Sequence, residues 1–254
     1  MLYSVFLWRR GFREDNRINY FLLLSGFILH TGSMVWRGLA LQRCPLGNLY
    51  EAMVFVGWGM VGVYLLVGFG ARLRFLGAFA SPLLFGIGVF ALLLGMELNS
   101  GAAPETRNGL ASLHGALILL SYGAFGLSSI AGVMYVTQER DLKMHRKRAI
   151  FSLMPPIERL EKVMSRLLLA GFILLTVGLS MSPVLLKREY GVYFKLEPKL
   201  VWSLLVWAIY FGLILLHGRF AQTGRRFAWG AIGSFVFVLL TFWGVNLLSH
   251  AHNP

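Results

Sequence analysis

Seven long apolar runs, none containing Lys, Arg, Asp or Glu, most constrain what this chain can fold into. They span 18–36, 52–71, 75–96, 108–138, 167–186, 200–216 and 227–249. A transmembrane helix needs roughly 20 apolar residues. A soluble domain of 254 residues, 57% hydrophobic and 14% charged, could not bury so much apolar surface. The sequence therefore predicts an all-α polytopic membrane helix bundle with about seven transmembrane helices.

Two stretches around these runs need a more specific interpretation. The run 108–138 is too long for one span, so it includes some loop or protrudes from the membrane. Residues 154–166 open with two prolines and carry Ile157, Leu160, Val163 and Met164 on one helical face. They predict a short amphipathic helix that lies along the inner membrane interface, before the fifth span. The domains expected are a basic cytoplasmic segment, 1–17, and one transmembrane domain, 18–252.

The net charge of +13 is explained by membrane topology and does not indicate a nucleic-acid partner. With the N-terminus inside and seven alternating spans, most of the 24 Lys and Arg residues fall in inner segments. Those left outside are Arg37, Arg43, Arg107, Lys187, Arg188, Lys195 and Lys199. This bias satisfies the positive-inside rule. It predicts a multi-pass protein of the inner (plasma) membrane with its C-terminus on the outer, periplasmic side.

The single cysteine, Cys44, excludes two classes of redox protein. One cysteine forms no intramolecular disulfide, and the chain contains neither C-x-x-C nor C-x-x-C-H. The chain is therefore not a c-type cytochrome with covalent haem and not a thiol oxidoreductase. The outer carboxylates show no acid–base pairing in the sequence, so whether the protein is an enzyme stays open.

The acidic residue Glu51 stands where the second span should begin. A carboxylate near a helix N-terminus is favoured by the helix dipole, which makes Glu51 a helix cap in the preferred interpretation. The alternative is a polar anchor for the outer loop that precedes it.

An aromatic and basic segment, 190–203, lies between the fifth and sixth apolar runs, on the outer side, and leads into the sixth. Pro198 suits the first turn of the helix that follows. Tyr190, Tyr193, Phe194 and Trp202, together with Lys195 and Lys199, would suit a flat apolar ligand that carries carboxylates. The alternative is an interfacial aromatic belt with snorkelling lysines.

Histidines at the ends of the spans are the candidate metal ligands. His114 lies near the outer end of the fourth span, and His250 and His252 lie at the outer end of the seventh. Two imidazoles from separate helices beside an aromatic loop make a bis-histidine haem iron site plausible. The alternatives are a packing histidine that bonds a neighbouring helix and a solvated tail. His217 lies at the inner end of the sixth span, and His30 lies deeper within the first span, so their depths differ too much for them to share one metal easily. A partner ligand for His217 would therefore come from another chain.

Four motifs occur in a fixed order along nearly the whole chain. They are Pro45–Glu51 (PLGNLYE), Leu113–His114 followed by Leu119–Tyr122 (LLSY), Tyr190–Leu204, and Phe242–Asn246 (FWGVN) with the final histidines. In this order they resemble the CcsA/CcmC/ResC cytochrome c assembly family, especially its CcsA branch and the related HemX and YpjD proteins. Residues 190–204 align without gaps on the family's tryptophan-rich haem-binding (WWD) pattern, W-G-x-x-W-x-W-D-P-K-E-x-W-S-L.

The resemblance implies a haem-handling membrane protein for c-type cytochrome biogenesis. It implies haem b, bound without a covalent link by His114 and by His250 or His252, beside an outer haem-binding-type loop at 187–200. It places His217 where the CcsA branch has a membrane-embedded haem ligand whose mate comes from a CcsB-type partner. Apocytochrome c is the implied acceptor, and any enzymatic role is at most part of a cytochrome c haem lyase.

The chain departs from the family inside the haem-binding pattern. The three loop tryptophans are Tyr190, Phe194 and Leu196, while Glu197 stands at the acidic position. These substitutions leave open two alternatives without haem-ligase chemistry. One is a HemX-like regulatory protein, and the other is a membrane anchor subunit of a larger complex.

Overall fold

The structure is a computed structural model that describes residues 2–4, 16–41, 44–46, 49–68, 76–93, 109–144, 155–193, 198–219 and 224–250. At residues 16, 189, 190, 198, 199 and 242–250 only the backbone is described. The helices are α2 (Asn16–Leu41), α3 (Leu49–Gly68), α4 (Leu76–Leu93), α5 (Gly109–Lys143), α6 (Ile157–Ser180), α7 (Ser182–Tyr190), α8 (Pro198–Arg219) and α9 (Arg225–His250). The predicted all-α helix bundle is confirmed within these residues.

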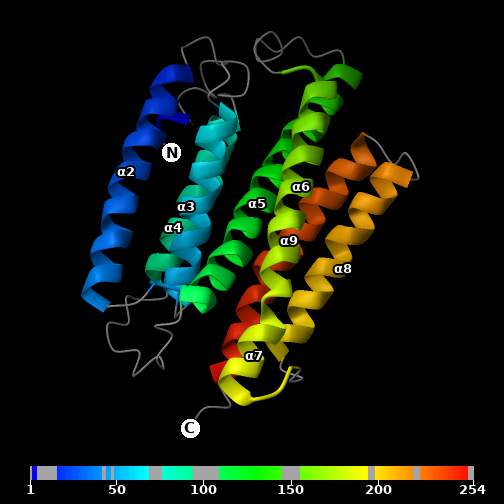
Figure 1. Cartoon of the computed structure of the whole chain (residues 1–254). Coiled ribbons are helices and arrows are strands. Elements are labelled where there is room, and N and C mark those ends of the chain that lie inside the picture. Colours follow the sequence, from blue (N-terminus) through cyan, green and yellow to red (C-terminus); the bar gives the residue numbers. More distant parts are fainter. Residues whose placement is uncertain are drawn as a thin grey trace.

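The long helices lie side by side and alternate in direction, as a polytopic bundle requires (Figure 1). Six stretches are long and apolar enough to cross a membrane: Arg17–Leu41, Leu49–Gly68, Leu76–Leu93, Gly109–Lys143, Ile157–Arg188 and Leu200–Arg219. Helix α9 is the seventh long helix, and its side chains are described only as far as Thr241. The seventh span and the orientation in the membrane stay predictions.

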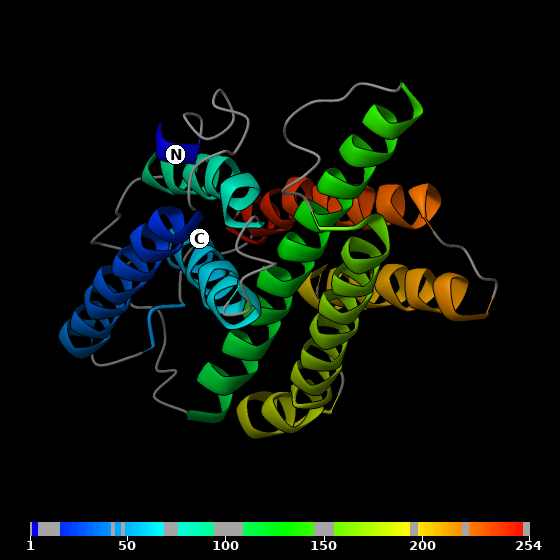
Figure 2. The same ribbon diagram turned by 90° about the horizontal axis from the view of Figure 1, so that it is seen from above.

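Helix α5 is the centre of the bundle. It contacts α3 and α4 on one side and α6 and α9 on the other, while α2 packs against α3 and α4 (Figure 2). Its burial reflects its composition, because small residues let neighbouring backbones approach closely. A Cβ atom added to Gly123 would lie 2.9 Å from the backbone nitrogen of Met60 in α3. On the opposite face, the ring of Phe125 stacks on Tyr210 of α8, with centroids 3.5 Å apart.

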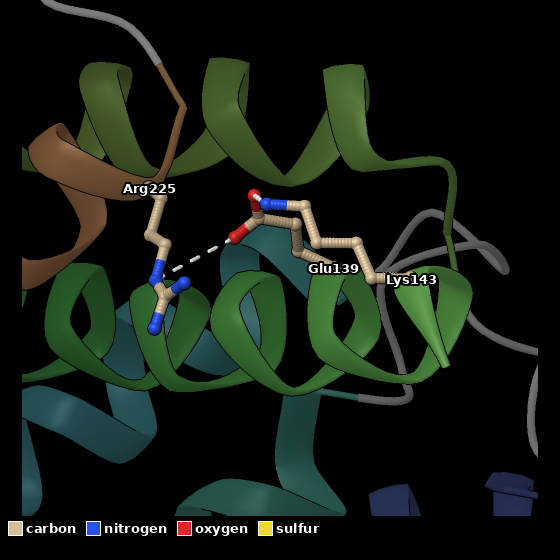
Figure 3. Close-up of polar contacts among 3 residues, drawn as sticks. All are labelled: Glu139, Lys143 and Arg225. Carbon is tan, nitrogen blue, oxygen red and sulfur yellow. Dashed lines mark hydrogen bonds and ion pairs between the residues drawn. The ribbon is translucent and has the colours of Figure 1, made fainter.

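The two ends of the bundle differ in what they hold. At one end, called the α7 end, α5 and α8 begin, α6 and α9 end, and the short helix α7 follows α6 (Figure 1). At the opposite end, called the Glu139 end, Glu139 of α5 forms ion pairs with Lys143 at 2.6 Å and with Arg225 of α9 at 3.9 Å (Figure 3). The α7 end is the one predicted to face outward.

Two sequence expectations change in the structure, and a third is decided between its alternatives. The separate amphipathic helix at 154–166 was wrong, because α6 runs unbroken from Ile157 to Ser180 and includes most of it. The over-long fourth run includes no loop from Gly109 onward, because it forms one helix that continues to Lys143. The predicted outer loop at 187–200 is shorter, because Lys187–Tyr190 belong to α7 and α8 begins at Pro198. The expected start of that helix at Pro198 is confirmed.

Candidate functional site

His114 is held in place by the end of a neighbouring helix. Its Nδ1 atom lies 2.7 Å from the carbonyl oxygen of Gly178, in the last turn of α6. This carbonyl also accepts the backbone N–H of Met181 at 3.1 Å, and its second lone pair is available to the His114 ring. The packing interaction allowed by the sequence is therefore present, and it uses one of the two ring nitrogens.

This hydrogen bond fixes which nitrogen of His114 carries the proton. A carbonyl oxygen only accepts, so Nδ1 donates its hydrogen to Gly178. The neutral imidazole then keeps a lone pair on Nε2, the atom with which histidine binds metals. Metal-binding histidines commonly donate their other N–H to a backbone carbonyl in this way, which orients the ring. His114 thus has the geometry of a preoriented ligand.

Gly178 allows the close approach on which this contact depends. A Cβ atom at this position would lie 2.9 Å from Cγ1 of Ile118, in the α5 turn that follows His114. One heptad earlier in α6, a Cβ at Gly171 would lie 2.6 Å from the ring of Phe125. The sequence analysis missed these partners, although two glycines seven residues apart on one helical face are a recognisable signal of close packing.

A buried polar link fixes the segment before α3 at the same end. The Arg37 Nε atom at the end of α2 lies 3.0 Å from Oε1 of Glu51, whose side chain is 1% exposed. The Arg37 guanidinium also lies 5.6 Å from the centroid of the Tyr50 ring. Glu51 is in the first turn of α3, so the predicted dipole effect still applies, but the anchor interpretation describes its contact. Leu46 then packs beside α5, 3.4 Å from where a Cβ of Gly115 would stand.

Trp202 connects three helices near the start of α8. Its Nε1 atom donates to Oγ1 of Thr241 in α9 at 2.8 Å. Its ring meets Tyr122 of α5 edge to face, with centroids 6.0 Å apart. Trp202 therefore joins the helices that carry His114 and the C-terminal histidines, and its predicted role in ligand binding stays a prediction.

The aromatic and basic segment begins where α7 ends. Lys187 donates a hydrogen bond to the Tyr193 hydroxyl, and its Nζ atom lies 4.3 Å from the centroid of that ring. Tyr193 is 52% exposed. Between them, Gly191 ends α7 with a φ of 73°, in the left-handed region. Val192 and Tyr193 are therefore exposed at the α7 end, and the two interpretations of the segment stay predictions.

The remaining predicted site residues divide into three groups. His250 ends α9 at the α7 end, and Tyr190 and Lys199 lie in α7 and α8 at that end, but only their backbones are described (Figure 1). Phe194, Lys195 and His252 lie outside the described residues. His217 is at the Glu139 end, stacked on Phe227 with ring centroids 4.0 Å apart. It is therefore remote from His114, as expected.

The left-handed conformation at Gly191 gives a first prediction. Gly191→Ala should destabilise the end of α7 by about 1–2 kcal/mol, because a side chain is disfavoured at positive φ. No atom lies within 4 Å of the added Cβ, so the effect would come from the backbone alone. Amide hydrogen exchange should be faster in α7 and unchanged elsewhere. The matched control is Gly212→Ala, an equally open helical position; equal exchange in α7 for both variants would contradict the prediction.

Comparison with known proteins gives one consistent result. The family model described as "Cytochrome C assembly protein" matches residues 46–252. The chain is 28% identical to cytochrome c biogenesis protein CcsA of Prochlorococcus marinus (strain NATL1A), over 95% of this chain and 85% of the relative. It is 26% identical to the CcsA protein of Pyropia yezoensis, over 98% of this chain and 90% of the relative. The family-model match includes His114, the 190–203 segment and the C-terminal histidines.

Proposed function

Because the chain belongs to the cytochrome c assembly protein family, we propose that it binds haem b without a covalent link at the α7 end of the bundle. The haem is cargo that is passed to apocytochrome c on the outer, periplasmic side of the inner membrane. The protein would work with a CcsB-type membrane partner, as part of a cytochrome c haem lyase. His217, at the other end, would ligate a second haem together with a histidine of that partner.

The tautomer of His114 carries this proposal. Its Nδ1–H is used by the carbonyl of Gly178, which leaves the Nε2 lone pair for the haem iron. The hydrogen bond also limits rotation of the ring, so little side-chain entropy is lost on binding. A second imidazole, from His250 or His252, would complete the bis-histidine ligation that the sequence suggests.

Cations and aromatic rings at the same end support haem rather than a bare metal ion. Lys187 and Arg188 are exposed on α7, where they can pair with propionates. The exposed ring of Tyr193 lies beside Lys187 and offers an apolar face to a porphyrin. Among the described residues no group of three or more His, Cys, Asp or Glu side chains could hold a metal ion. A porphyrin supplies four of the iron ligands itself, so one or two histidines suffice.

The absorption spectrum of the purified protein tests the proposal. After expression with ample haem, the wild-type protein should show a Soret band typical of histidine-ligated haem. The band should be lost in the triple variant His114→Ala, His250→Ala, His252→Ala. A matched control is His30→Ala, which removes an imidazole from the middle of α2, away from the α7 end.

Two results would contradict the proposal. One is a wild-type protein that never binds haem, and the other is a triple variant that keeps the wild-type spectrum. Deletion of the gene distinguishes the proposal from the remaining alternative, which is a regulatory or anchor protein without haem-ligase chemistry. If the proposal is right, deletion lowers the level of mature c-type cytochromes; if the alternative is right, deletion leaves that level intact.

A further inference from the structure

The imidazole of His217 lies flat against the ring of Phe227 at the Glu139 end. The two ring centroids are 4.0 Å apart, and the ring planes differ by 16°. Phe227 is in the first turn of α9 and is 1% exposed. A side chain that is packed on every side is held in one rotamer. The phenyl ring therefore presents a fixed surface to one face of the imidazole.

This stack belongs to a regular series of contacts between the antiparallel helices α8 and α9. Near the α7 end, Trp202 joins α8 to α9 through a hydrogen bond. Toward the Glu139 end, a Cβ atom added at Gly230 of α9 would lie 2.5 Å from Cδ1 of Leu213 in α8. His217 comes four residues after Leu213, and Phe227 comes three residues before Gly230, so the stack is the next contact in the same register. The close approach at Gly230 thus sets where the two rings meet.

The start of α9, which carries Phe227, is fixed on two other helices. The backbone N–H of Gly224 donates to Oε1 of Glu161 in α6 at 3.2 Å. Gly224 has a φ of 68°, in the left-handed region that favours glycine. A Cβ atom at this position would lie 2.8 Å from the hydroxyl oxygen of Tyr135 in α5. The backbone before Phe227 therefore packs closely on both α5 and α6, and it positions the phenyl ring.

The stack determines the plane of the His217 ring. Histidine binds a metal through a nitrogen lone pair, which lies in the plane of the imidazole. Stacking uses the face of the ring, so it fixes this plane without using the edge that carries the nitrogens. His217 also lines a pocket of about 430 Å³ between the first half of α6 and the end of α8. At His114 a backbone carbonyl orients the ring, and at His217 an aromatic ring does so.

We propose that Phe227 is a positioning residue for the second haem, because its stacked ring fixes the plane in which His217 binds the iron. The inference rests on the second haem of the proposed function. Phe227 acts through the ligand and does not itself touch the iron. An imidazole that is already oriented loses less rotational freedom when it binds. Removing the phenyl ring should therefore weaken haem binding at this site and widen the range of ring orientations.

Nuclear magnetic resonance of the haem-free full chain, with isotope-labelled histidine, tests the stack itself. Protons above the face of a phenyl ring are shielded, so the His217 ring signals should lie upfield of those of free histidine. Their loss in His217→Gln identifies them. Phe227→Leu, which keeps an apolar side chain, should abolish the upfield shift. The matched control is Phe235→Leu, a 2% exposed position two turns further along α9, which should leave the shift unchanged.

The wild-type spectrum is decisive even if Phe227→Leu folds poorly. His217 signals without an upfield shift would show that the rings are not stacked and would overturn the inference. An upfield shift that survives in Phe227→Leu would also overturn it, because another ring would then be the cause.

Haem binding is tested on the full chain purified together with the CcsB-type partner. The variant His114→Ala, His250→Ala, His252→Ala serves as the parent, because it leaves only the second haem. Adding Phe227→Leu should weaken haem binding about two- to tenfold, the range expected for loss of an aromatic pair. It should also broaden the low-spin electron paramagnetic resonance signal, since this signal depends on the orientation of the ligand plane. Adding Phe235→Leu should change neither.

The outcomes separate this inference from the proposed function. If the parent complex binds no second haem, the inference fails together with the proposed role of His217. If the parent and its Phe227→Leu derivative bind the second haem equally tightly and with the same signal, the inference alone fails. Equal losses in the Phe227→Leu and Phe235→Leu derivatives would also overturn it, because any buried phenyl ring of α9 would then have the same effect.

Discussion

Arg37→Leu should lower the free energy of unfolding by about 3–5 kcal/mol, because it removes the guanidinium that pairs with the buried carboxylate of Glu51. That carboxylate is 1% exposed and lies 3.0 Å from the Arg37 Nε atom. The double variant Arg37→Leu, Glu51→Leu should recover most of the loss, because it removes both charges from the interior. Unfolding of the purified protein in mixed micelles, followed by circular dichroism, measures these differences.

The exposed pair at the other end of the bundle serves as the control. Lys143 lies 2.6 Å from Glu139, but its side chain is 65% exposed (Figure 3). Lys143→Leu should therefore change the free energy of unfolding by no more than about 1 kcal/mol. If the two leucine variants differed by less than 1 kcal/mol, the Arg37–Glu51 pair would have no special structural role.

Gly123→Ala should destabilise the bundle by about 1–3 kcal/mol, because the added methyl group meets backbone atoms that cannot rotate away. The new Cβ would lie 2.9 Å from the Met60 nitrogen and 3.0 Å from the carbonyl carbon of Gly59. Helices α3 and α5 would have to separate, and the start of α5 carries His114. The same micelle unfolding assay measures the loss of stability.

An open glycine in α4 provides the contrast. A Cβ added at Gly88 has no neighbouring atom within 4 Å. Gly88→Ala should therefore be neutral or should stabilise the protein by up to about 1 kcal/mol, since alanine favours helices over glycine. Equal effects of Gly88→Ala and Gly123→Ala would show that α3 and α5 are not packed backbone to backbone.

The positions of the helices were predictable because the apolar runs contain no charge. The error at the start of α6 has a physical cause. Charged residues from Glu158 to Arg166 stand just before the apolar run that begins at Leu167, but none of them breaks a helix. The opposite face of this part of α6 is buried against α5. Ser128 of α5 donates to the Met164 carbonyl at 2.9 Å, and Leu160 is 1% exposed. Hydropathy marks where a helix enters the membrane, not where the helix begins.

The break between α6 and α7 had a local signal that was not used. Pro183 has no backbone N–H, so the hydrogen-bond ladder of α6 cannot pass through it, and it stands in the first turn of α7. The apolar run continues to Leu186 and conceals this break. The same reasoning was applied successfully at Pro198, where charged and aromatic residues surround the proline.

The sequence allowed the candidate site residues to be selected by type, but it did not allow their contacts to be predicted. His114 could be selected because an imidazole near the end of a span is costly and unusual. Its partner could not, since Gly178 is 64 residues away and contributes only a backbone carbonyl. The ion pair of Arg37 with Glu51 joins two helices across a loop, so a single sequence gave no reason to connect them. Tertiary contacts of this kind decide which nitrogen of the His114 ring is available to a ligand, and amino-acid composition does not reveal these contacts.

Chemical rescue of a His114 variant tests the central claim most directly. In His114→Gly the imidazole is removed, and the haem spectrum of the purified protein should change from six-coordinate toward five-coordinate or disappear. Adding free imidazole should restore the wild-type spectrum, because the ligand atom then returns to the vacated position. A His114→Gly protein whose spectrum matches the wild type before imidazole is added would contradict haem ligation by this residue.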